Sequence, residues 1–258
     1  MKQIVTQAAY EGGKVLMEFY RGQTSQKDKG ERDIVTDADI ASERVIIKIL
    51  SDAFPEHNFL SEEVGHINKN SDYTWIIDPL DGTVNFASKN PLFAISIGLV
   101  HKNQVKLSCI YLPILGELFY AEKGKGATLN DKKISISSHT KLKECINSAS
   151  PGAKTKEKIV AMSKIIRVLL PRGRSLLMYG STPLALAFVA CGRADNYITY
   201  KSDVYNMAAG YLLIKEAGGK VTDFENHEFD ISAKSLNVIA SNGHVHEELL
   251  SMMKAVHL

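Results

Sequence analysis

Two aspartates three positions apart, Asp78 and Asp81, have the residue type and spacing best suited to chemistry in this sequence. They follow the apolar run 75–77, a proline lies between them, and Gly82 and Thr83 come next. A strand that brings two carboxylates to one place, beside the free N–H groups of a following helix, suits a divalent cation and a phosphate together. The alternative is a strand that ends in an acidic turn, with Asp81 as the cap of the helix.

Other acidic residues could complete such a site. Glu62 and Glu63 follow a short apolar stretch upstream, and the alternative for this pair is an exposed acidic loop. Thr36 and Asp39 have the spacing of a capping box, which explains both residues without function, and Asp37 is an equal candidate on that spacing. Two carboxylates and one carbonyl leave a six-coordinate Mg²⁺ shell incomplete without water and substrate oxygens, which favours phosphate chemistry.

Length and composition indicate a globular protein with a large core, or two lobes that share one cleft. The chain has 258 residues, of which 45% are hydrophobic, and a formal net charge of +2. Its basic residues are scattered and no apolar stretch approaches about 18 residues, so neither nucleic-acid binding nor a membrane span is expected. The separated cysteines Cys109, Cys145 and Cys191 indicate reduced thiols in a cytoplasmic protein.

In the first half, the apolar periodicity predicts helices followed by an antiparallel meander. Helices are expected over residues 3–20 and about 38–53, the second with Ile40, Ile47 and Leu50 on one face. Residues 21–33 and 66–73 have the polar composition of loops, and a short helix opens at Gly82 and Thr83. Strands are expected at 59–61, 75–78, 93–100, 105–111, 118–120, 128–129 and 134–136.

In the second half, beyond about residue 140, helices and strands alternate. Helices are expected at 156–170, 181–191, 206–217 and 244–257, and strands at 196–199, 221–222 and 238–240. His244 and His246 open the last helix and are expected at the surface. The change of pattern predicts an N-terminal α+β lobe over 1–140, with the metal-binding motif, and a C-terminal α/β lobe over 141–258, with the active site between them.

Residues 75–86, W-I-I-D-P-L-D-G-T-V-N-F, resemble the first signature of the inositol monophosphatase family of lithium-sensitive, Mg²⁺-dependent phosphatases. Further family elements follow in order at 33–39 (D-x-V-T-x-x-D), 61–63, 117–130, 180–182, 192–195, 208–210 and 216–219. The resemblance covers nearly the whole chain. It implies a layered αβαβα sandwich of the sugar-phosphatase type, a homodimer, and hydrolysis of a small polyol or sugar phosphate by a metal-activated water.

The resemblance also implies roles for individual residues. The metal ligands would be Glu62, Asp78, the Leu80 carbonyl, Asp81 and Asn206, which would hold two or three Mg²⁺ ions, with Mn²⁺ as a substitute. Asp39 would serve a further, weaker metal and pair with Thr83, which would orient the attacking water, and Glu63 would support them from behind. The phosphate would lie against the N–H groups of Gly82 and Thr83, and Thr199 would lie at the substrate.

Three positions depart from the family pattern. Asn206 stands in place of an aspartate, which removes one negative charge, so weaker binding of the second metal is expected unless nearby Asp203 compensates. Thr199 replaces a glutamate that contacts the inositol ring, and Ser88 replaces a frequent histidine. The substrate therefore stays open among an inositol-1-phosphate-like compound, fructose 1,6-bisphosphate and a 3′(2′),5′-bisphosphate nucleotide. A weakly active or non-catalytic regulatory role also stays open.

Overall fold

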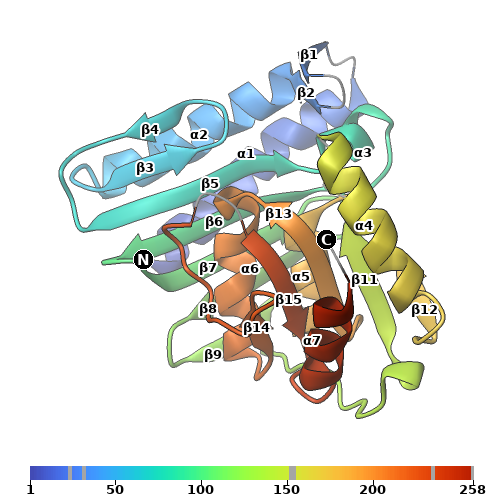
Figure 1. Ribbon diagram of the computed structural model, residues 1–258. Helices are drawn as coiled ribbons and strands as arrows, with labels where there is room; N and C mark the ends of the chain where they lie inside the picture. The colour runs from blue at the N-terminus through green and yellow to red at the C-terminus, as the bar shows by residue number, and fades with distance from the viewer. Residues whose placement is uncertain (23–24, 31–32, 151–154, 234–235, 257–258) are drawn as a thin grey trace.

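Two large β-sheets and three layers of α-helices alternate in the fold (Figure 1). The computed structural model describes residues 1–258 except 23–24, 31–32, 151–154, 234–235 and 257–258. From one side to the other, the layers are α1 and α2, the larger sheet, α5 and α6, the smaller sheet, and α4 and α7. This is the expected αβαβα sandwich.

The larger sheet has eight strands in the order β10-β9-β8-β7-β6-β5-β3-β4. They are β3 (Asn58–Ser61), β4 (Gly65–Ile67), β5 (Tyr73–Asp81), β6 (Ala94–His101), β7 (Gln104–Leu112), β8 (Glu117–Glu122), β9 (Gly126–Leu129) and β10 (Lys132–Lys133). Neighbouring strands are antiparallel except β3 and β5, which are parallel. Because helices cover both faces of this sheet, β6 is buried on both sides although its sequence alternates in size.

Four helices cover the two faces of the larger sheet. On the outer face lie α1 (Lys2–Arg21) and α2 (Asp37–Ala53), and on the inner face lie α5 (Thr182–Ala190) and α6 (Val204–Glu216). Helix α5 is apolar all round because it lies between two sheets. A Cβ at Gly210 would come within 2.2 Å of Leu186, so the glycine permits the close packing of α5 against α6.

The smaller sheet has five strands in the order β12-β11-β13-β15-β14. They are β11 (Ile146–Ser150), β12 (Ser175–Leu177), β13 (Asn196–Ser202), β14 (Lys220–Thr222) and β15 (Leu236–Ser241). The remaining elements are the helices α3 (Thr83–Ala87), α4 (Lys156–Leu169) and α7 (His246–Ala255), the short η1 (Leu142–Glu144) and the paired strands β1 (Gln26–Gly30) and β2 (Asp33–Thr36). Helices α5 and α6 contact both sheets, and a lobe boundary near residue 140 stays a prediction.

The helices form within a few residues of their predicted positions, but three predictions about loops and strands are wrong. Residues 26–30, in the stretch 21–33 that was expected to be a loop, form a strand paired with 33–36, since the pairing needs only backbone groups. Positions 23–24 and 31–32 lie outside the described residues. Residues 66–67, at the start of the predicted loop 66–73, belong to strand β4, which begins at Gly65. After the turn at Asn130 and Asp131, the strand that pairs with β9 is 132–133, not the predicted 134–136.

Two predictions about burial are also wrong. Ile40 lies at the exposed side of α2, because the buried face of this helix includes polar residues that an apolar pattern does not reveal. His246 is fully buried instead of exposed. The cysteines are free, as expected, with Cys109 and Cys145 buried. None of the helices in the described ranges combines the length and the apolar character needed to cross a bilayer.

Candidate active site

The C-terminal end of β5 carries both aspartates of the predicted metal motif, and both are buried, with 1% of Asp78 and 8% of Asp81 exposed. Side chains alternate along a strand, so residues three apart should point to opposite faces of the sheet. The pairing with β6 shifts between Asp78, opposite Ser96, and Asp81, opposite Ala94. This β-bulge adds one residue to β5 and allows the two carboxylates to share one side.

Carboxylates surround Asp78. Its Oδ1 accepts a hydrogen bond from the backbone N–H of Leu80 at 3.0 Å. Burial raises the pKa of Asp78 well above its ordinary value, and the negative charges of Glu62, Asp81 and Asp39 raise it further. The structure therefore brings four of the predicted carboxylates within electrostatic reach of one another. Clustered negative charge in a buried place is an environment that a divalent cation stabilises.

The first turn of α5 holds Asp81. The backbone N–H of Thr182 donates a hydrogen bond to Asp81 Oδ1 at 2.8 Å, which satisfies one of the free donors of a helix N-terminus. The Thr182 hydroxyl lies 2.8 Å from the hydroxyl of Tyr197 on β13. Burial raises the pKa of Tyr197 to about 12, and the nearby charge of Asp81 contributes. Both halves of the chain thus meet at Asp81.

Asp39 caps α2 and also faces the site. Its Oδ2 accepts hydrogen bonds from the Thr36 backbone N–H at 2.9 Å and the Thr36 hydroxyl at 2.5 Å. Its Oδ1 lies 3.4 Å from the Thr83 hydroxyl, which is also 3.1 Å from the Leu80 carbonyl oxygen. Burial raises the pKa of Asp39 to about 6, and the charge of Glu63 contributes. Asp39 therefore caps α2 with one oxygen and faces Thr83 in the candidate site with the other.

The other candidate in that segment, Asp37, lies elsewhere. It is exposed and accepts a hydrogen bond from the Ser25 hydroxyl. The capping-box spacing could not separate Asp37 from Asp39, because that choice depends on which side of α2 faces the sheet.

Gly82 and Thr83 open α3, next to Asp81. Gly82 is in the left-handed conformation, with φ = 93°, and a Cβ there would lie 2.9 Å from the Leu92 carbonyl oxygen. The amide of Asn85, a residue without a predicted role, donates to the Leu92 carbonyl at 2.6 Å and to the Tyr179 carbonyl at 2.8 Å. Asn85 therefore connects α3 to the segment that precedes α5.

Glu62 and Glu63 lie in the tight turn between β3 and β4. The Glu62 N–H donates to the Ile77 carbonyl at 3.3 Å. Glu43 of α2 accepts hydrogen bonds from the Glu63 and Val64 N–H groups, both at 3.1 Å. Glu43 was not among the predicted residues. The sequence could have indicated it only by its position, because Glu43 lies on the same side of the helix as apolar residues.

The first turn of α6 approaches the same carboxylates. Asp203 precedes this helix as its N-cap, and Asn206 lies in its first turn. Burial raises the pKa of the neighbouring Tyr205, and the charges of Asp203 and Glu62 contribute, so the start of α6 lies near the Glu62 turn. The amide of Asn206 is thus placed on an element that borders the acidic cluster.

Thr199 and Ser88 are two of the positions that depart from the family pattern. Thr199 is buried on β13, where its hydroxyl donates to the Ser150 carbonyl at 3.4 Å, inside the smaller sheet. Ser88 follows α3 and is exposed. The structure thus brings together Glu62, Asp78, Asp81 and Asp39 with Thr83 and the Leu80 carbonyl. The Thr199 hydroxyl lies beside Tyr197, whose pKa is raised by burial and by the charge of Asp81.

The donors present fit a hard cation such as Mg²⁺, which prefers oxygen ligands. Within the described ranges, no three His, Cys, Asp or Glu side chains are arranged to hold one ion by themselves. A metal ion here would therefore need a carbonyl, an amide, water or substrate oxygens in addition to the carboxylates. The Leu80 carbonyl, whose oxygen lies 3.1 Å from the Thr83 hydroxyl, is a donor of that kind.

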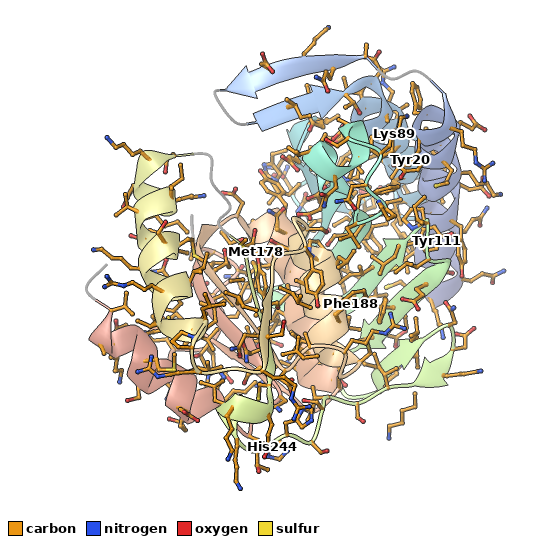
Figure 2. All side chains as sticks on the ribbon, turned by 90° about the vertical axis from the view of Figure 1, so that its right-hand side faces the viewer. Tyr20, Lys89, Tyr111, Met178, Phe188 and His244 are labelled. Carbon is orange, nitrogen blue, oxygen red and sulfur yellow. The ribbon has the colours of Figure 1, made fainter. Side chains whose placement is uncertain are left out.

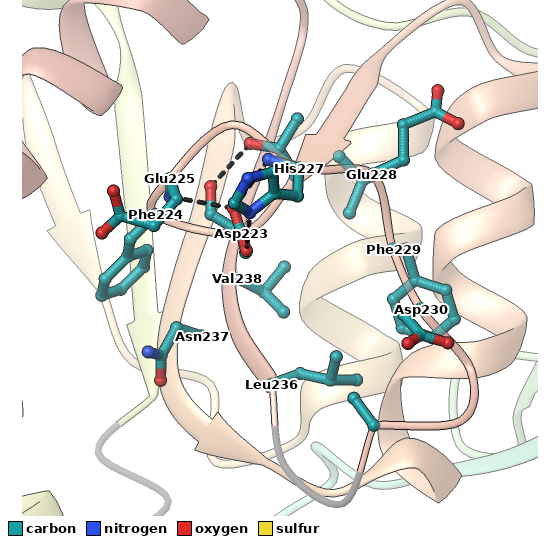
Figure 3. A pocket seen from close by; sticks show the side chains of 13 residues that line it. Asp223, Phe224, Glu225, His227, Glu228, Phe229, Asp230, Leu236, Asn237 and Val238 are labelled. Carbon is teal, nitrogen blue, oxygen red and sulfur yellow. Dashed lines mark hydrogen bonds and ion pairs between the residues drawn. The ribbon is translucent and has the colours of Figure 1, made fainter.

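A separate cavity of about 350 Å³ is lined by residues of β14, of β15 and of positions 223–233 between them (Figure 3). Its lining includes Phe224, Phe229 and several carboxylates, among them Asp223, which accepts a hydrogen bond from the N–H of His227 at 2.8 Å. None of the predicted site residues lines this cavity, so it is distinct from the carboxylate cluster at β5.

Fold and cluster together define a layered αβαβα protein with an acidic site beside the helix layer that its two sheets share. The model of the inositol monophosphatase family matches residues 1–257. The chain belongs to this family.

Individual relatives are similar over nearly their full length. A Thermotoga maritima protein named fructose-1,6-bisphosphatase/inositol-1-monophosphatase is 36% identical over 245 residues, which cover 95% of this chain and 92% of the relative. The Nus factor SuhB of Haemophilus influenzae is 35% identical, with 98% of this chain and 96% of the relative covered. The crystal structure of the extragenic suppressor protein SuhB from Bartonella henselae superposes with a TM-score of 0.93 at 34% identity, covering 98% of each chain.

Proposed function

We propose that this protein is a Mg²⁺-dependent phosphomonoesterase that hydrolyses a small polyol or sugar phosphate similar to inositol 1-phosphate. The observation that carries the proposal is the group of carboxylates around Asp78, whose pKa is raised first by burial and then by the negative charges of its neighbours. Membership of the inositol monophosphatase family supports a phosphatase. The name of the Thermotoga maritima relative supports inositol 1-phosphate and fructose 1,6-bisphosphate as substrates to test.

Glu62, Asp78, the Leu80 carbonyl and Asp81, together with Asn206, would hold two or three Mg²⁺ ions, with Mn²⁺ as a substitute. When bound, these ions neutralise the phosphate and lower the pKa of a water molecule.

The remaining residues position the reactants. When Thr83 donates its single hydroxyl proton to Asp39 instead of the Leu80 carbonyl, its oxygen can accept a hydrogen bond from the attacking water. The N–H groups at the start of α3, at Gly82 and Thr83, would bind the phosphate. Glu63 would support Asp39 and Thr83 through its negative charge, which adds to the effect of burial in raising the pKa of Asp39. Thr199 would contribute to the substrate side through its place next to Tyr197.

The setting of the enzyme is part of the proposal. We expect a homodimer. Two exposed apolar residues support it: Leu177, 38% exposed, ends the edge strand β12, and Met178, 59% exposed, follows it. Figure 2 shows Met178 and Phe188 on one face of the molecule. The free cysteines support a reducing, cytoplasmic compartment. Inhibition by lithium is expected from the family.

The test is phosphate release from inositol 1-phosphate, fructose 1,6-bisphosphate and 3′-phosphoadenosine 5′-phosphate over a Mg²⁺ titration. Release from one of the first two supports the proposal, and preference for the third would identify a bisphosphate nucleotidase instead. Asp78→Asn is the control, because it removes the carboxylate at the centre of the cluster. No release from any of the three at high Mg²⁺ would contradict a phosphatase.

A non-catalytic regulatory role is the second candidate. It is supported by Asn206, which lowers the negative charge available to a metal, and by relatives that are named Nus factor SuhB. Such a protein would release little phosphate from any substrate, and an aspartate at position 206 would increase the release.

A further inference from the structure

Helix α2 turns one polar face towards the candidate site. Asp39, Ser42 and Glu43 are spaced three and four residues apart, so they share a side of the helix, and all three are buried. Each contacts a different part of the site. Asp39 faces Thr83, and the Ser42 hydroxyl donates to the Pro79 carbonyl, within the bulge of β5, at 3.3 Å. Glu43 reaches the turn that carries Glu62 and Glu63.

Glu43 accepts three hydrogen bonds from this turn with one oxygen. Its Oε1 accepts from the Ser61 hydroxyl and from the N–H groups of Glu63 and Val64. Three residues connect Ser61 on β3 to its partner Gly65 on β4, and Glu43 holds the amides of two of them. On the other side of the turn, the Glu62 N–H donates to β5. The backbone on either side of the Glu62 side chain is therefore fixed.

The second oxygen of Glu43 makes this carboxylate unusual. Glu43 is fully buried, and its Oε2 has no hydrogen-bond partner in the described part of the chain. Burying a carboxylate with one oxygen unsatisfied costs free energy, whereas the fold of α2 is supported by apolar neighbours such as Ile46 and Leu50. The three hydrogen bonds that Glu43 accepts fix the conformation of the turn, and this offsets the cost of burying the carboxylate.

We propose that Glu43 is a positioning residue: its carboxylate holds the turn so that Glu62 faces Asp78 and the two can share a metal ion. This inference rests on the proposed function, since it takes Glu62 as a metal ligand. Groups that orient metal ligands from behind affect metal affinity by about 10- to 100-fold when they are removed.

The experiment is a titration of the metal-free protein with Mn²⁺ alone, without substrate, followed by calorimetry or electron paramagnetic resonance. Glu43→Gln is expected to weaken Mn²⁺ binding by about 10- to 100-fold. Ser61→Ala should weaken it less, because the two N–H bonds remain. Asp52→Asn, an exposed carboxylate paired with Lys48 on the same helix, is the matched control and should leave the affinity unchanged.

A second measurement separates positioning from a general effect on the fold. Amide hydrogen exchange should become faster at Glu63 and Val64 in Glu43→Gln, while amides in the core strands keep their protection. A purely structural role would instead lower the metal-free melting temperature and leave the Mn²⁺ affinity unchanged. That result would overturn the positioning role of Glu43 but not the proposed metal site. If the unaltered protein bound no Mn²⁺, the proposed metal site itself would be overturned.

Discussion

The backbone N–H of Thr182 donates a hydrogen bond to Oδ1 of Asp81 at 2.8 Å, across 101 residues of sequence. This bond connects the end of β5 in the larger sheet to the first turn of α5, between the two sheets. The N–H groups of the first helical turn have no partners within the helix, so a carboxylate is a favourable acceptor there. An aspartate in the first half of the chain is thus held by a helix in the second half.

Thr182→Pro is predicted to weaken metal binding and phosphatase activity by about 10- to 100-fold. Proline is tolerated at the first position of a helix, and Ser181 before it is already extended, but proline has no N–H. Its ring would also occupy the space next to Asp81 Oδ1. The measurement is the Mg²⁺ dependence of phosphate release, together with Mn²⁺ affinity.

Thr182→Val is the matched control for this prediction. It keeps the N–H to Asp81 and removes only the hydroxyl that lies 2.8 Å from the Tyr197 hydroxyl. We expect a loss of about 1 kcal/mol in the free energy of unfolding, with metal affinity retained. Equal Mn²⁺ affinities in the two variants would show that the N–H does not position Asp81.

Gly82→Ala is predicted to abolish most activity and to lower the free energy of unfolding by about 2–3 kcal/mol. The residue is in the left-handed region, and the new Cβ would lie 2.9 Å from the Leu92 carbonyl oxygen. Either α3 or the chain around Leu92 must move, which displaces Thr83 from Asp39. Urea denaturation and activity assays on the same preparation measure both effects.

Gly116→Ala separates backbone strain from collision. Gly116 also has a positive φ, of 63°, but nothing lies within 4 Å of its missing Cβ. This variant should lose only about 1 kcal/mol and keep full activity. A similar loss of activity in both glycine variants would count against a special role for the start of α3.

The sequence predicted the location of the candidate site better than its geometry. The motif around Asp78 and Asp81 indicated a metal site at the end of a strand, and the helices that border it were predicted within a few residues. The bulge between the two aspartates was not predictable from spacing, because their odd separation alone places them on opposite faces.

Residues that support the site were missed for a different reason. Apolar periodicity identifies the side of a helix that is buried only where that side is apolar. On α2 the buried side includes Asp39, Ser42 and Glu43, so Ile40 was assigned to the wrong face. His246 was missed in the same way, because polar side chains that find partners inside a protein carry no distinct pattern in a single sequence.

Asn206→Asp is predicted to lower the Mg²⁺ concentration needed for half-maximal activity by about tenfold. The first turn of α6 borders the acidic cluster, and an added carboxylate there attracts a divalent ion by more than 1.4 kcal/mol, which corresponds to a factor of ten. A large gain in the maximal rate as well would favour the regulatory interpretation of the natural protein. Mg²⁺ titration of phosphate release measures both quantities.

Asp203→Asn tests whether Asp203 already compensates for Asn206. If it does, this variant should need more Mg²⁺ than the unaltered protein, and the gain from Asn206→Asp should be larger in its background. If Asp203 acts only as the N-cap of α6, where asparagine is about as favourable, the variant should leave the Mg²⁺ requirement unchanged. An unchanged Mg²⁺ requirement in Asn206→Asp would contradict a metal role for position 206.

His246 predicts a dependence of stability on pH that is independent of the active site. Its Nε2 lies 2.9 Å from the Thr222 hydroxyl and its Nδ1 lies 2.8 Å from the Ser241 hydroxyl. Burial lowers the pKa of His246 to about 4, and the positive charge of Lys220 contributes. The unfolded chain therefore binds a proton at this histidine below about pH 6.5, whereas the folded protein does not until about pH 4.

The free energy of unfolding should consequently fall as the pH is lowered from about 6.5 to 4, by about 1–3 kcal/mol from this residue. Urea denaturation across that range measures the effect, and His246→Gln should lack this part of the pH dependence because glutamine does not titrate. His244→Gln, at an exposed position two residues away, should keep the profile of the unaltered protein. If His246→Gln retained the same pH dependence, the loss of stability would have to come from other groups, and a neutral, buried His246 would be excluded as its source.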